Sequence, residues 1–77
     1  MLTVKVRHFA ALREARGCAQ EQVEVPPGTT AVGLFHQLFG DDSGITVAFL
    51  RNRTQVTPDS PLADGDELAF LPPFGGG

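Results

Sequence analysis

Apolar and polar residues alternate strictly from Leu2 to Arg7, which is the period of a half-buried β-strand. Continued, the alternation places His8 inward and Phe9 outward, so we expect this strand to end or bulge at that point. Val23 and Val25 alternate with polar neighbours before residues 26–28, Pro-Pro-Gly, end the run. This second run predicts a strand that pairs with the first.

Helix-forming residues occupy positions 10–16, and Gly17 follows them as a stop signal, which predicts a short helix. A clearer helix begins after Thr29 or Thr30, either of which can cap it, and ends at Gly40. Gly33 inside this helix suggests close approach to a strand. The apolar residues follow the i, i+3, i+4, i+7, i+8 spacing of a core-facing stripe: Ala31, Leu34, Phe35, Leu38 and Phe39.

Three further strands are predicted downstream. Residues 45–50 are apolar on both faces, which is typical of a central or interface strand, and residues 51–53 make a turn into a short strand at 54–56. Residues 58–63 form a crossing segment, and the turn at 64–66 leads into a last strand at 67–71. This order predicts an α+β fold in which one main helix covers a mixed sheet and the first and last strands are parallel neighbours.

The composition narrows the classes of function. A chain of 77 residues permits one domain, and a net charge of -3 with six Lys and Arg gives no general electrostatic reason to bind nucleic acid. No apolar run approaches the roughly 18 residues of a membrane span, so no membrane partner is expected. The single cysteine, Cys18, cannot form an internal disulfide, which agrees with a reducing compartment and predicts the cytoplasm.

The most unusual stretch is the segment 72–77, Pro-Pro-Phe-Gly-Gly-Gly. Consecutive glycines cannot pack a core, so they need another explanation. The prolines favour an extended spacer, Phe74 is an apolar anchor for a partner, and residues 75–77 are thin enough to enter a narrow slot in another protein. The segment indicates a reactive carboxylate on a delivery arm; the alternative is an interaction domain with idle glycines.

Residues 6–14, 25–30 and above all 61–73, followed by terminal glycines, resemble the small subunit of molybdopterin synthase, a ubiquitin-like β-grasp sulfur carrier. The resemblance covers nearly the whole chain, and the Leu-x-Asp-Gly-Asp-Glu strand running into Pro-Pro is its specific part. It implies a β-grasp domain at residues 1–73, with four to five strands and one main helix, and a glycine tail at 74–77. Two features depart from the family pattern: a third glycine, and an Arg-Asn-Arg turn in place of an Asn-Gly-like one.

The resemblance also implies the chemistry. A ubiquitin-activating-like adenylyltransferase would adenylate the carboxylate of Gly77 with ATP and Mg²⁺, and a persulfide donor would convert it into a thiocarboxylate. The large synthase subunit would bind the tail through Pro73, Phe74, Gly75 and Gly76 and pass sulfur to cyclic pyranopterin monophosphate. A hetero-oligomer is therefore expected, with no cofactor bound by this chain and no autonomous activity. Sulfur delivery to thiazole, cysteine or tRNA thiolation, or conjugation as a protein modifier, remains the alternative.

The side chains offer weaker candidates. His8 and His36 lie far apart in sequence and lack an acidic partner at ligand spacing, so we expect structural or surface roles and no metal site. Cys18 has no paired base nearby and is expected to be an inert thiol. Asp64 and Asp66 flank a glycine and are expected to bond backbone amides of a turn. The arginines are expected to be solvated, with Arg51 and Arg53 as candidates for partner contacts.

Overall fold

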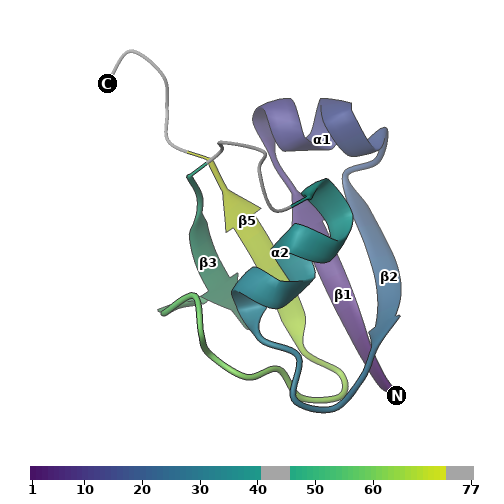
Figure 1. Cartoon of the computed structure of the whole chain (residues 1–77). Helices are drawn as coiled ribbons and strands as arrows, with labels where there is room; N and C mark the ends of the chain where they lie inside the picture. The colour runs from purple at the N-terminus through teal and green to yellow at the C-terminus, as the bar shows by residue number, and fades with distance from the viewer. Residues whose placement is uncertain (41–45, 73–77) are drawn as a thin grey trace.

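The computed structural model describes residues 1–40 and 46–72. Five strands form one sheet in the order β2-β1-β5-β3-β4. Helix α2 crosses one face of the sheet, and helix α1 lies at the end where β1 and β5 finish (Figure 1). The elements are β1 (Leu2–His8), α1 (Ala10–Arg16), β2 (Gln20–Val25), α2 (Ala31–Phe39), β3 (Ala48–Arg51), β4 (Thr54–Val56) and β5 (Glu67–Leu71).

The sheet is mixed, as the sequence predicts. β1 pairs with β2 in antiparallel fashion and with β5 in parallel, and β3 joins β5 to the edge strand β4 through antiparallel pairs. The parallel register places Val6 beside Leu68 and His8 beside Phe70. The first and last strands are therefore parallel neighbours, and β5 occupies the centre of the sheet.

The core lies between the sheet and α2. Val4 and Val6 of β1 are fully buried, and Leu34 and Phe35 of α2 pack against the same layer. Phe70 of β5 is also fully buried, and its ring lies 5.1 Å from that of Phe35 and 5.7 Å from that of Phe49, centroid to centroid. The alternation in β1 and the helical stripe in α2 therefore meet in one apolar layer.

Helix α1 ends as predicted, because Gly17 has a left-handed φ of 77° and its N–H donates to the Arg13 carbonyl. Thr30 caps α2, and its Oγ1 accepts a hydrogen bond from the Gly33 N–H at 3.1 Å. The prediction that Gly33 approaches a strand is wrong. A Cβ at that position would instead lie 3.1 Å from the capping hydroxyl of Thr30.

The turn between β3 and β4 is tighter than the turn predicted at residues 51–53. Asn52 and Arg53 both have positive φ, at 51° and 70°, which is the pattern of a two-residue type I′ turn. The Asn52 side chain links this turn to β5, since its Oδ1 accepts from the Glu67 N–H and its Nδ2 donates to Asp66. The predicted strand at 45–50 begins at Ala48 in the structure, and Ile45 lies outside the described residues.

Candidate functional site

The central strand β5 ends just before Pro72, which is the last residue that the structure describes. The carboxyl end of β5 lies at the same end of the molecule as α1 (Figure 1). The predicted site residues Pro73, Phe74, Gly75, Gly76 and Gly77 follow directly, and all five lie outside the described residues. The described part of the chain therefore ends next to the carboxyl end of the central strand.

A hollow of about 220 Å³ lies on the outward face of the sheet, and Leu71 at the end of β5 is one of its lining residues. Ala69 and Leu71 of β5 alternate with the core residues Leu68 and Phe70, so they point to the open face. Phe9 follows β1 and lines the hollow, which agrees with the outward position predicted from the alternation, and the Arg7 guanidinium lies 5.6 Å from its ring centroid. The lining is Arg7, Phe9, Leu50, Arg53, Glu67, Ala69 and Leu71.

This open face has the composition of a docking surface. Leu50 pairs with Ala69 in the β3–β5 ladder, so apolar side chains from two strands sit together at its centre. Arg7, Arg53 and Glu67 surround them. An apolar centre with a charged rim is the usual anatomy of a protein–protein contact. It adjoins the strand that carries the predicted tail.

A second group of polar side chains lies under α1. His8 is 2% exposed, and its Nε2 lies 2.7 Å from Oε2 of Glu21 on β2. Arg16 at the end of α1 donates two hydrogen bonds of 2.8 Å to the same carboxylate. Cys18 lies beside them, with its Sγ 3.7 Å from Oε2 of Glu21. The prediction that His8 lacks an acidic partner is therefore wrong.

Hydrogen bonds, charges and burial within this group of side chains shift the pKa values of Glu21 and Cys18. The hydrogen bonds from Arg16, and next those from His8, lower the pKa of Glu21 to about 2 against the opposing effect of burial. The carboxylate is therefore ionised at neutral pH and only accepts, so Nε2 of His8 carries the ring proton. Burial, and then the nearby Glu21 charge, raise the pKa of the Cys18 thiol. The thiol is therefore protonated and weakly nucleophilic, as expected from the sequence.

The other candidate side chains have structural roles. Asp64 Oδ1 accepts from the Thr3 N–H at 2.7 Å, and Asp66 Oδ2 accepts from the Ala63 N–H at 2.8 Å, so the predicted turn role of both is confirmed. Arg51 is not simply solvated, because it donates to the Pro61 carbonyl at 2.8 Å. His36 lies on α2 against Phe35, with ring centroids 6.1 Å apart.

Glu21 is the residue that sequence reasoning missed. It shares the inward face of β2 with Val23 and Val25, and an acid on the core face of an amphipathic strand is the signal that could have found it. The β1–β2 register then brings it next to the end of β1, where His8 sits.

A mixed five-stranded sheet with parallel first and last strands and one crossing helix is the β-grasp architecture of ubiquitin-like proteins. The model of the ThiS family matches residues 6–77. The chain therefore belongs to the ThiS family, a family of sulfur carriers.

Individual relatives match over their full length. The molybdopterin synthase sulfur carrier subunit of Escherichia coli is 36% identical over 81 residues, which cover 96% of this chain and 99% of the relative. The protein of that name from Mycobacterium tuberculosis is also 36% identical, over 83 residues that cover 100% of both chains.

Solved structures give the same fold. The small archaeal modifier protein 1 of Haloferax volcanii superposes with a TM-score of 0.83 at 26% identity, covering 96% of this chain and all of the other. A chain in the complex of subunits 1 and 2 of the molybdopterin-converting factor from Helicobacter pylori superposes with a TM-score of 0.65 at 24% identity. That match covers 99% of this chain and 100% of the other.

Proposed function

We propose that this chain carries sulfur as a thiocarboxylate on Gly77 and donates it to cyclic pyranopterin monophosphate within molybdopterin synthase. The observation that carries the proposal is the full-length similarity to molybdopterin synthase sulfur carrier subunits, at 31–36% identity. The matching family model includes the terminal glycines. On this proposal the reactive group is the terminal carboxylate, and the β-grasp domain is the part that partner proteins bind.

The tail must first be activated, because a carboxylate is a poor electrophile. We propose that an adenylyltransferase partner uses ATP and Mg²⁺ to form an acyl adenylate on Gly77 with release of pyrophosphate. The terminal sulfur of a persulfide donor then attacks the acyl carbon, and AMP leaves. A partner thiol cleaves the resulting S–S bond and releases the thiocarboxylate. This chain supplies no catalytic side chain to these steps and acts as a covalent carrier.

The large synthase subunit is the proposed acceptor of the loaded tail, by analogy with the subunit 1 and 2 complex from Helicobacter pylori. Residues 75–77 carry no Cβ and can pass a narrow entrance, with Pro73 and Phe74 positioned at its rim. The open-face hollow beside the end of β5 is the surface that we propose docks on both partners. We propose the cytoplasm as the site of this chemistry, because its reducing conditions keep thiols and persulfides available.

Reconstitution tests the destination of the sulfur. Chain loaded as the thiocarboxylate is mixed with the large subunit and cyclic pyranopterin monophosphate, and formation of the dithiolene product is measured. The proposal predicts product and return of the tail to the carboxylate. A chain whose Gly77 is capped as an amide should give none, and equal product from the capped chain would overturn the proposal.

A second candidate is conjugation of Gly77 to lysine side chains, which the structural likeness to small archaeal modifier protein 1 favours. It shares the activation step and differs in the acceptor. Adding the activating enzyme and ATP to a lysate, followed by mass spectrometry of tryptic peptides, distinguishes the two. The last tryptic site of this chain is Arg53, so a modified lysine would carry residues 54–77 as an isopeptide-linked branch. Such branched peptides support the modifier function, whereas free thiocarboxylate without them supports the carrier function.

A further inference from the structure

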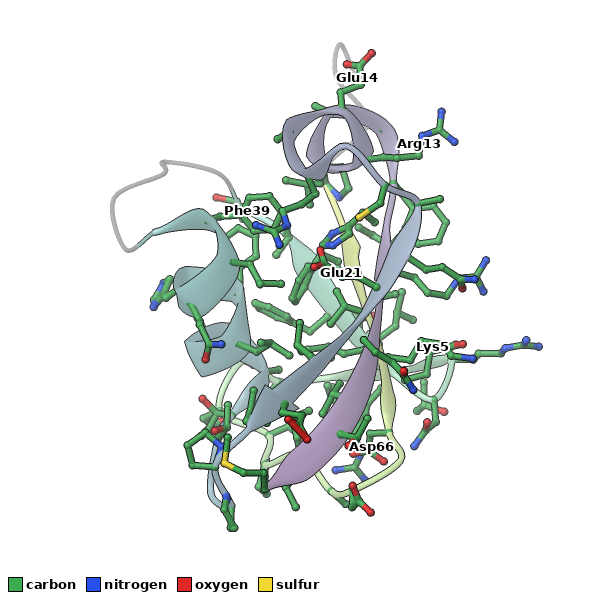
Figure 2. The ribbon with its side chains drawn as sticks, turned by 90° about the vertical axis from the view of Figure 1, so that its right-hand side faces the viewer. Lys5, Arg13, Glu14, Glu21, Phe39 and Asp66 are labelled. Atoms are coloured by element: carbon green, nitrogen blue, oxygen red, sulfur yellow. The ribbon has the colours of Figure 1, made fainter. Side chains whose placement is uncertain are left out.

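Three side chains of different chemistry converge beneath α1. They come from the end of β1, the loop after α1 and the start of β2: His8, Cys18 and Glu21. One ligand atom from each lies within 4.8 Å of the other two. Figure 2 shows Glu21 below α1, on the side of the sheet where α2 carries Phe39.

Two of the three donor spacings are near those of a tetrahedral zinc site, and the third, between His8 and Cys18, lies within 4.8 Å. Zinc bonds of about 2.3 Å to sulfur and about 2.0–2.2 Å to nitrogen or oxygen separate neighbouring donor atoms by roughly 3.3–3.6 Å. Here Cys18 Sγ lies 3.7 Å and His8 Nε2 lies 2.7 Å from Glu21 Oε2. An ion would therefore leave the sulfur–oxygen edge almost unchanged and widen the nitrogen–oxygen edge by about 0.6 Å.

Packing holds the imidazole in place with its Nε2 toward the Glu21 carboxylate. Its side chain is fully buried, and its ring packs edge-on against Phe39, with centroids 5.6 Å apart, and against Phe70 at 6.0 Å. Nδ1 is buried without a hydrogen-bond partner among the described residues, whereas Nε2 faces the carboxylate. Binding requires the ring proton to sit on Nδ1 and the Cys18 thiol to release its proton to solvent.

The charges of the proposed ligands also balance the charge of the ion. A thiolate and a carboxylate together neutralise a divalent cation. Arg16 holds Oε1 of Glu21 at 2.8 Å, and this contact can persist as an outer hydrogen bond while Oε2 turns to the ion. The Arg16 side chain is 32% exposed, so its second contact, to Oε2, can be given up to water.

We propose that His8 Nε2, Cys18 Sγ and Glu21 Oε2 form a binding site for Zn²⁺ that leaves the fourth coordination position open to water. Nitrogen, sulfur and oxygen donors in a three-ligand set are the donor types of zinc sites with an open position. The proposed sulfur-carrier function assigns no role to these three side chains, so the metal site can be tested separately from it. It replaces the expectation from the sequence that the chain has no metal site.

Direct titration of the whole chain tests the site. Protein freed of metal with a chelator is titrated with Co²⁺ and then with Zn²⁺, while absorption and native mass are recorded. The expected result is one ion per chain at micromolar protein, with a thiolate-to-cobalt charge-transfer band that Zn²⁺ abolishes. Absence of that band, or several weakly bound ions per chain without it, would overturn the proposal.

Variants locate the ion. Cys18→Ser and Glu21→Gln should each weaken binding by at least the roughly 10–100-fold that loss of an outer-shell partner costs. Glu24→Gln removes the same charge from an exposed position on β2 and should leave affinity unchanged. Arg16→Gln keeps all three ligands and removes only the outer hydrogen bonds to Glu21, so it should weaken binding less than either ligand variant. Unchanged affinity in Cys18→Ser would show that the ion lies elsewhere and would reject the site.

Discussion

The Nε2 atom of His8 lies 2.7 Å from Oε2 of Glu21, so a buried imidazole at the end of β1 is tied to the start of β2. The same carboxylate accepts two hydrogen bonds from Arg16, which ends α1. One side chain therefore fastens the segment that connects the first two strands to the sheet.

This relationship makes stability depend on pH in a defined direction. The pKa of Glu21 falls from its usual 4.5 to about 2 in the folded state, mainly through the hydrogen bonds from Arg16. A depressed folded pKa stabilises fully above the unfolded value, and the contribution is lost as pH falls from about 4.5 to about 2. After screening by solvent we expect about 1–2 kcal/mol.

The measurement is the free energy of unfolding by urea in metal-free protein at steps from pH 7 to pH 2. The difference between the natural chain and Glu21→Gln should be largest near neutral pH and shrink in acid. Glu24→Gln is the control and should follow the natural chain. A difference between the natural chain and Glu21→Gln that stays constant with pH would argue against the ion pair as its source.

The type I′ turn predicts a stabilising substitution. Arg53 has a φ of 70°, where an L-residue with a Cβ is strained, and its ion pair with Glu67 is long, at 3.9 Å, and exposed. Arg53→Gly should raise the free energy of unfolding by about 1 kcal/mol. Arg53→Ala keeps the Cβ and should bring little gain. Equal gains from both variants would trace the effect to the lost charge instead of to the backbone.

Phe70 is predicted to be the most sensitive core position on β5. It is fully buried, and its ring contacts those of Phe35, Phe39 and Phe49 as well as that of His8. Phe70→Ala should cost about 3–5 kcal/mol, a large share of the stability of so small a domain. Leu71→Ala changes the next residue, on the open face, and should cost far less. Thermal unfolding followed by circular dichroism compares them, and equal losses would contradict this packing.

A substitution on the open face is predicted to weaken partner binding without unfolding the domain. Leu50 lies half-buried in the hollow beside the end of β5, so Leu50→Glu should weaken docking on the activating enzyme by about 10-fold or more while leaving the fold intact. Gln37→Glu adds the same charge at an exposed position on α2 and should bind normally. Calorimetric titration measures both affinities. Normal binding by Leu50→Glu would move the docking surface elsewhere.

The periodic elements could be predicted from the sequence because local spacing alone determines them. The strand alternation before His8 and the helical stripe from Ala31 to Phe39 both occur where expected. The parallel pairing of first and last strands followed from the order of elements.

Other features depend on tertiary contacts that spacing does not encode. The link between His8 and Glu21 needs the β1–β2 register and the length of the intervening helix. Arginine rarely adopts a positive φ. The positive φ of Arg53 depends on closure of the hairpin, so the sequence does not predict it. The role of Gly33 was misassigned because its neighbour is the helix's own cap.

The central claim is that Gly77 is the working group, and mass spectrometry of the intact chain tests it most directly. The chain is incubated with a cognate activating enzyme, ATP, Mg²⁺ and a persulfide donor, and its mass is compared with that of a reaction lacking ATP. The expected result is an ATP-dependent gain equal to replacement of one oxygen by one sulfur, located by fragmentation at Gly77. An unchanged mass, or sulfur located on Cys18, would contradict it.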